Sequence, residues 1–168
     1  MKKKKLFILI PFVIILLFWG MILFNKNTFI LYDKFNQKEH ILFLKKVENI
    51  IPNGGISDVL SFRIYHFKTK DIAKIKNNIN FKKVDDNLLD IYNTVVKDCF
   101  IMHLDNEKLE LFKNNFNVNL LKSNSNFYMF SETEDNNRYY FELLILDNDN
   151  NSLYSIISNY GVYKYIRE

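Results

Sequence analysis

The chain has 168 residues, a formal net charge of +4 and a pI near 9.0, with 48% apolar and 16% aromatic residues. Abundant Phe and Tyr exclude a disordered tail, because they supply the material of a core. Five of the 23 basic residues and none of the 19 acidic ones precede residue 27, so the remainder is almost neutral and does not indicate a nucleic-acid partner.

The first predicted element is a membrane-spanning helix over residues 6–24. These 19 residues carry no charge, and 15 of them are Leu, Ile, Val or Phe. Such a helix is about 28 Å long, close to the thickness of the hydrocarbon core of a bilayer. Because the stretch is long for a cleaved signal peptide and no small-residue cleavage site follows it, we expect it to be retained. The anchoring side chains are distributed along it: Leu6, Ile10, Ile14, Leu17, Trp19 and Phe24.

The lysines before this helix predict its orientation. Residues 1–5 form a short tail that holds Lys2, Lys3, Lys4 and Lys5. The positive-inside rule keeps such a tail in the cytoplasm and sends residues 27–168 across the membrane. We therefore expect a single-pass protein of the cytoplasmic (inner) membrane, if the source is bacterial, with one extracytoplasmic domain and the lipid bilayer as its first partner.

Helical spacing of apolar residues predicts a helix over residues 36–51, next to the membrane. Asn36 is its expected cap, and the apolar positions are Ile41, Leu44, Val47 and Ile51. The Pro-Asn-Gly-Gly turn at residues 52–55 ends it.

Residues 58–121 are expected to form a strand followed by helices. The strand covers residues 58–67, and the helices cover 69–79, 86–99 and 106–115. Residues 126–160 change to strand-like runs joined by short polar loops, which predict an antiparallel meander of three strands. The fold class is therefore α+β, with about three to four helices and an antiparallel sheet that ends in this meander.

Cys99 is the only cysteine, so the chain cannot form an intramolecular disulfide. Cys99 and His103 would share a helix face if the helix continued, which makes them weak candidates for a catalytic thiolate–imidazole pair. The alternative is a buried, inert thiol among apolar neighbours. Zinc would need further Cys or His ligands, and we find no phosphate-binding, nucleotide or metalloprotease motif. We therefore expect no cofactor and no enzymatic activity.

A second weak candidate is the segment Asp147-Asn-Asp-Asn-Asn151. Asp147, Asp149 and Asn151 match the opening of a calcium-binding loop. The later glycine and glutamate of such a loop are replaced by Ser152 and Ser158. The same letters are typical of a hairpin turn, which is the interpretation we favour.

Tyrosines crowd the last third of the chain, and we name four as candidate interface residues: Tyr154, Tyr160, Tyr163 and Tyr165. The alternative is that strand positions bury them in the core. From these features we expect a membrane-anchored protein-interaction module whose partner is another envelope protein, either as an assembly subunit or as an inhibitor or immunity-type binder. The alternatives are an anchored, hydrolase-like enzyme and a sensor of cations or small ligands.

Overall fold

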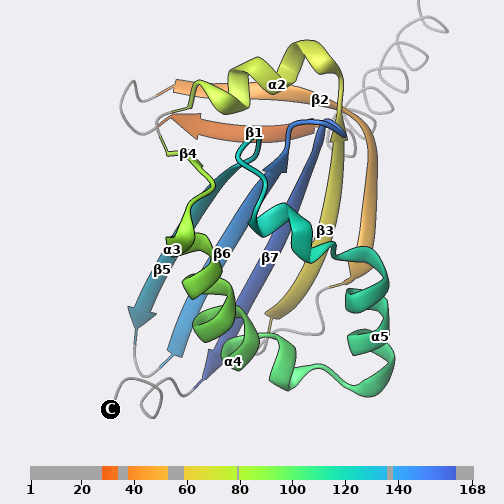
Figure 1. Ribbon diagram of the computed structural model, residues 1–168, viewed down its shortest axis with the longest axis vertical. Helices are drawn as coiled ribbons and strands as arrows, with labels where there is room; N and C mark the ends of the chain where they lie inside the picture. The colour runs from red at the N-terminus through yellow and green to blue at the C-terminus, as the bar shows by residue number, and fades with distance from the viewer. Residues whose placement is uncertain (1–27, 34–37, 53–58, 79, 136–137, 162–168) are drawn as a thin grey trace, which may run out of the picture.

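The structure is a computed structural model that describes residues 28–33, 38–52, 59–78, 80–135 and 138–161 (Figure 1). Its framework is a seven-stranded antiparallel sheet with the strand order β1-β2-β3-β7-β6-β5-β4. The strands are β1 (Thr28–Asp33), β2 (Lys38–Ile51), β3 (Val59–Phe67), β4 (Lys82–Lys83), β5 (Phe127–Asp135), β6 (Arg138–Asp147) and β7 (Ser152–Gly161).

The α+β class expected from the sequence is therefore the observed class. Strands β5, β6 and β7 form the expected meander, because each pairs antiparallel with the next across a short loop. In β6, Leu143, Leu144, Ile145 and Leu146 are all buried, so both faces of this strand are covered at that end. The strand lies between two partners, which explains its run of apolar residues.

The prediction of a helix over residues 36–51 is wrong, because residues 38–51 form the long strand β2. Its pairing with β3 shifts register between Leu44 and Lys46 and again between Asn49 and Ile51. Such bulges add a residue to one strand and break the alternation of its side chains. Leu44 and Val47 consequently share a sheet face at a spacing of three, which imitates the period of a helix.

Helices cover one face of the sheet. In order they are α3 (Asp86–Ile91), the π-helix η1 (Tyr92–Val96), α4 (Lys97–Cys99), the 3₁₀ helix η2 (Ile101–His103), α5 (Asn106–Asn115) and the 3₁₀ helix η3 (Val118–Leu121). Figure 1 shows α3, α4 and α5 in front of the strands. Their inward side chains pack on alternate residues of the sheet, including Phe62, Phe141, Leu143 and Ile156, to form the larger core.

A smaller core lies on the opposite face, at the end of the sheet where α2 (Thr69–Lys76) crosses it (Figure 1). Ile72 and Ile75 of this helix pack against Phe67 of β3 and Leu146 of β6. The remainder of that face, toward the other end of β3, β7 and β6, belongs to neither core. This division leaves one sheet face only partly covered by the described helices.

The predicted anchor, with Leu6, Ile10, Ile14, Leu17, Trp19 and Phe24, and its flanking lysines lie outside the described residues. Among the helices that are described, none combines the length and the apolar character needed to cross a bilayer. The anchor therefore stays a prediction from the sequence.

Candidate functional site

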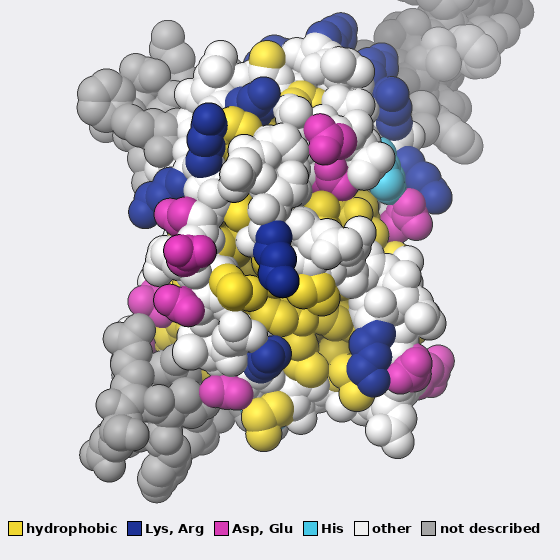
Figure 2. All heavy atoms as spheres, viewed as in Figure 1, with side chains coloured by type: hydrophobic (Ala, Val, Ile, Leu, Met, Phe, Trp, Pro, Cys, Tyr) yellow, Lys and Arg dark blue, Asp and Glu magenta, His cyan; other side chains and the backbone are white. Residues whose placement is uncertain are grey.

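An apolar groove opens on the outer side of the helical layer. It has a volume of about 190 Å³ and is lined by Tyr92, Ile101, Leu109, Phe112, Lys113, Phe116 and Val118. Figure 2 shows the corresponding area as a patch of apolar side chains in the middle of the visible face. The groove thus lies where η1, η2, α5 and η3 meet, above the larger core.

The floor of the groove is a stack of aromatic rings. The ring of Phe116 lies parallel to those of Tyr92 and Phe112, with centroid distances of 5.6 Å and 5.0 Å. Phe62 of β3 contacts Phe112 edge to face from below at 5.0 Å. These contacts fix the rings in place, so the groove is pre-formed and its shape does not depend on a ligand.

The groove has two walls, helix α5 and the segment that begins at Tyr92, and residues close to each wall in the sequence determine its position. Asp105 caps helix α5, because its carboxylate accepts a hydrogen bond from the amide of Lys108 at 2.8 Å. From that start, Leu109 and Phe112 follow at a spacing that places both on one side of the helix. On the other wall, Tyr92 begins a π-helical segment that interrupts the α-helical hydrogen bonding between α3 and α4. Such segments occur frequently at functional sites.

Two lysines set the charge next to the groove. Lys113 lines it directly, and Nζ of Lys97 lies 5.8 Å from the ring centroid of Tyr92. Lys113 also contacts Glu110 at 3.1 Å, but both side chains are exposed. Exposed pairs of this kind contribute about 0–1 kcal/mol, so Lys113 can exchange Glu110 for another carboxylate at little cost.

The size of the groove decides what it can hold. A cavity of roughly 150 Å³ accepts benzene, whereas cofactor and drug sites measure roughly 300–1,000 Å³. At about 190 Å³, the groove matches one aromatic or branched apolar side chain. Among the described residues that line it, the titratable groups are a tyrosine and a lysine, and burial raises the pKa of Tyr92 above its usual value. The groove therefore suits recognition of a side chain better than acid–base chemistry.

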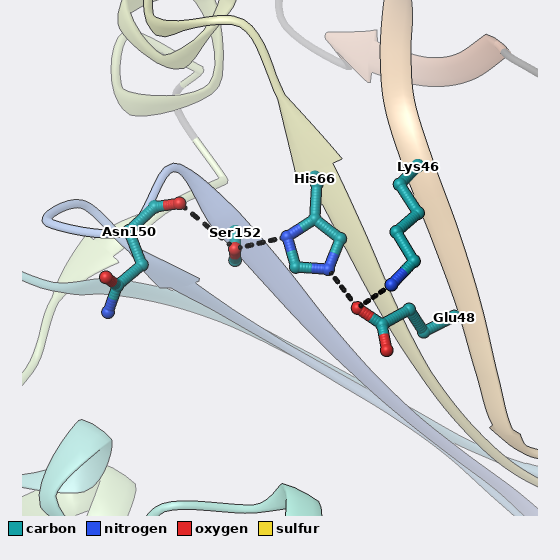
Figure 3. Close-up of polar contacts among 5 residues, drawn as sticks. All are labelled: Lys46, Glu48, His66, Asn150 and Ser152. Carbon is teal, nitrogen blue, oxygen red and sulfur yellow. Dashed lines mark hydrogen bonds and ion pairs between the residues drawn. The ribbon is translucent and has the colours of Figure 1, made fainter.

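A polar chain on the same face links β2, β3 and β7 (Figure 3). Oε1 of Glu48 lies 2.7 Å from Nε2 of His66 and 3.1 Å from Nζ of Lys46. The other ring nitrogen of His66 lies 2.9 Å from Oγ of Ser152. The hydrogen bond from Lys46 makes the largest contribution to lowering the pKa of Glu48, and the hydrogen bond from His66 makes the next largest.

This Ser–His–Glu order is that of a catalytic triad, but its serine is poorly placed for attack on a substrate. Ser152 is only 2% exposed, and its hydroxyl also lies 3.1 Å from the carbonyl of Asn150. None of the residues in this polar network lines the groove described above. We assign it the structural role of joining three strands. Sequence reasoning missed it because residues 36–51 were interpreted as a helix, which hides the alternation of Lys46 and Glu48 beside His66.

Cys99 and His103 do not lie on one continuous helix. Helix α4 ends at Cys99, and His103 lies in the 3₁₀ helix η2. Cys99 is buried; burial, and then the nearby Asp98 carboxylate, raise the pKa of its thiol to about 11. A thiol with that pKa is protonated at neutral pH and is a poor nucleophile. Its carbonyl accepts a hydrogen bond from Ser158 at 2.6 Å, which ties the end of α4 to β7.

The segment from Asp147 to Asn151 forms the hairpin turn between β6 and β7. Oδ1 of Asp147 accepts hydrogen bonds from the amides of Asp149 and Asn150, both at 3.1 Å. Asn151 has a positive φ of 53°, a conformation that asparagine tolerates well. Within the described ranges, no cluster of three or more His, Cys, Asp or Glu side chains is arranged to hold a metal ion.

Of the tyrosines named as interface candidates, Tyr154 is partly buried beneath the helices. Its ring centroid lies 6.4 Å from that of Phe62 and 6.3 Å from that of Phe116. Tyr163, Tyr165 and the side chain of Tyr160 lie outside the described residues. The groove residues Phe112, Phe116 and Val118 are not among the interface candidates named from the sequence. No local pattern in the sequence marks them as a site; the exposure of Val118 is visible only in the structure.

Comparison of the chain with protein-family models, with curated proteins and with solved structures found no match. The functional argument therefore rests on the geometry of the groove and on the sequence.

Proposed function

We propose that this chain is a membrane-anchored protein-binding module, and that its groove receives one apolar side chain of a partner protein. The observation that carries the proposal is the pre-formed aromatic floor beside an exposed apolar rim, where Val118 is 47% exposed. Protein interfaces draw most of their binding energy from a few apolar anchors inserted into such pockets. An envelope assembly subunit and an inhibitor of another envelope protein both fit this role.

The chemistry next to the groove specifies the partner segment further. Lys113 and Lys97 are basic groups close to the aromatic floor. A partner with an aromatic or leucine side chain followed by an Asp or Glu satisfies both features, because the anchor fills the groove while the carboxylate meets a lysine. Charge at the edge of an interface acts mainly on the association rate and on specificity.

Placement at the membrane rests on the uncharged residues 6–24 and the preceding lysines. It is tested by protease treatment of intact spheroplasts that carry a tag after Glu168. We expect full-length protein in untreated membranes and loss of the tag on treatment. A protected tag would show that the topology is the reverse of the one proposed. Full-length protein in the soluble fraction would show that residues 6–24 do not anchor the chain.

Binding at the groove is tested by in vivo photocrosslinking of the full chain. A photoreactive residue replaces Val118 in one variant and Met102, which is 74% exposed and does not line the groove, in the other. We expect one discrete adduct from position 118 and none from position 102. Val118→Asp should abolish binding of the partner identified in this way, whereas Met102→Asp should retain it. Identical adducts at both positions, or none at either, contradict the proposal.

The alternative functions receive less support. An enzyme using Cys99 would need an exposed thiolate, whereas the thiol is buried and its pKa is raised to about 11. A cation sensor at Asp147 would need free carboxylate oxygens, whereas Oδ1 binds two backbone amides and Oδ2 lies 2.8 Å from the side-chain nitrogen of Asn150.

A further inference from the structure

The sheet carries a second distinctive surface on the face opposite helices α3–α5, which is turned away from the viewer in Figure 1. We call it the rear patch; its residues are Ser61 and Arg63 on β3, Ile157 and Asn159 on β7, and Tyr140 and Glu142 on β6. None of the six belongs to either core, and all except Ser61 are partly exposed. The rear patch is therefore a partly exposed, mixed polar and apolar sheet surface.

Several polar groups of the rear patch lack partners within the described part of the chain. Oγ of Ser61 and Nε of Arg63 are buried and accept or donate no hydrogen bond there, and Ser61 is only 1% exposed. None of the hydrogen bonds or ion pairs between described residues involves the carboxyl of Glu142, whose pKa is raised by burial. Unsatisfied buried groups of this kind are costly and call for an explanation.

The strand register places the two opposite charges symmetrically about β7. Arg63 pairs with Ser155, and Glu142 pairs with Ile157, the next residue on the same face of β7. With strands about 4.8 Å apart and about 3.4 Å per residue, the Cα atoms of Arg63 and Glu142 lie at the ends of a diagonal of roughly 12 Å. Its midpoint falls on β7, between Ser155 and Ile157.

We propose that the rear patch is a homodimer interface in which Arg63 of each copy pairs with Glu142 of the other. A two-fold axis that lies between the two facing sheets, perpendicular to this diagonal, brings each guanidinium over the carboxyl of the second copy. Contacts of this isologous kind are the commonest way in which identical chains associate. Ile157 lies close to the axis and supplies an apolar contact at the centre.

A second copy fits this surface because the surface is complementary to itself. Within the described residues, each copy carries on this patch one charged group of each sign without a partner, so pairing two copies leaves neither charge unpaired. Glu142 is already largely removed from water in the single chain, so pairing adds attraction without a large new desolvation cost. The six residues cover roughly 14 by 17 Å of sheet, or about 240 Å² per copy, well below the roughly 800 Å² per partner of a standard interface, so we expect a weak dimer.

Because the dimer is weak, the test uses covalent trapping of the full chain in membranes or mild detergent with a short bismaleimide. On the same strand spacings, Ile157 lies within about 2 Å of the proposed axis, whereas Thr133 of β5 lies roughly 14 Å from it. Thr133 is the more exposed of the two and is the matched control. We expect Ile157→Cys to give a crosslinked dimer and Thr133→Cys to give none. The wild-type chain, whose single thiol is buried, controls for background.

Charge reversal separates the proposal from random encounter. In the Ile157→Cys chain, Arg63→Glu or Glu142→Arg alone should lower the crosslinked fraction at least about fivefold, since like charges then face each other. The double variant restores opposite charges and should recover the starting fraction, which also shows that it is folded. Equal crosslinking at positions 157 and 133, no crosslinking at either, or no recovery in the double variant overturns the proposal. The groove lies on the opposite face, so Val118→Asp should leave the dimer unchanged, and each proposal can fail without the other.

Discussion

Phe112 lies at the contact between helix α5 and the sheet, and its replacement by alanine tests the packing of the helical layer. The side chain is 2% exposed, and its ring centroid lies 5.0 Å from those of Phe62 and Phe116 and 5.5 Å from that of Phe100. Removing a buried phenylalanine costs about 3–5 kcal/mol. The three ring contacts favour the upper part of this range, whereas the adjoining groove lets neighbouring groups relax. We expect a loss of about 3–4 kcal/mol in the free energy of unfolding.

The measurement is denaturant unfolding of the full chain in detergent, followed by circular dichroism. Leu111→Ala is the control, because Leu111 is on the same helix and 40% exposed, and its loss should stay within about 0.5 kcal/mol. Domains of this size are stable by about 5–15 kcal/mol, so the Phe112 variant should still fold. A Phe112→Ala loss below about 1 kcal/mol, or equal to that of the control, refutes the packing of α5 against β3.

Three further predictions concern titratable groups. Burial raises the pKa of Glu142, so ionisation of this carboxyl lowers the stability of the fold as pH rises through the folded pKa. In dilute, monomeric samples at pH 7, Glu142→Gln should therefore unfold at a higher denaturant concentration than wild type. At pH 3.5 the two proteins should unfold at the same denaturant concentration. Hydrogen bonds from Lys46 and, to a smaller extent, from His66 lower the pKa of Glu48. The ionised carboxyl therefore stabilises the fold above the unfolded pKa, and this stabilisation is lost as pH falls through the folded pKa. Glu48→Gln should lower the melting temperature at pH 7 and not at pH 2.5. With its pKa raised to about 11, Cys99 should resist a thiol reagent at pH 8 in the native chain and react fully in denaturant. Rapid native labelling, or pH-independent effects of either substitution, would contradict these assignments.

Local signals in the sequence were sufficient for several elements. Helix α5 begins at Asn106, as the spacing of its apolar residues predicts, and the structure adds the capping Asp105 directly before it. The turn at Asp147 and the strands on either side follow from Asn and Asp chemistry between apolar runs. Each of these elements depends mainly on residues close to it in the chain, which is why a single sequence reveals it.

Elements that depend on distant partners were decided by the tertiary structure. Residues 38–51 form a strand because β3 pairs with them. Two register shifts in that pairing give the apolar residues of the strand a spacing that resembles that of a helix. The groove needs Tyr92 and Phe116 from separate helical segments, and the rear patch needs Arg63 and Glu142 from strands on either side of β7. By itself the sequence determined the α+β class, the meander and the expectation of a membrane anchor. The two candidate binding surfaces exist only because pairing and packing bring together residues that no local pattern connects.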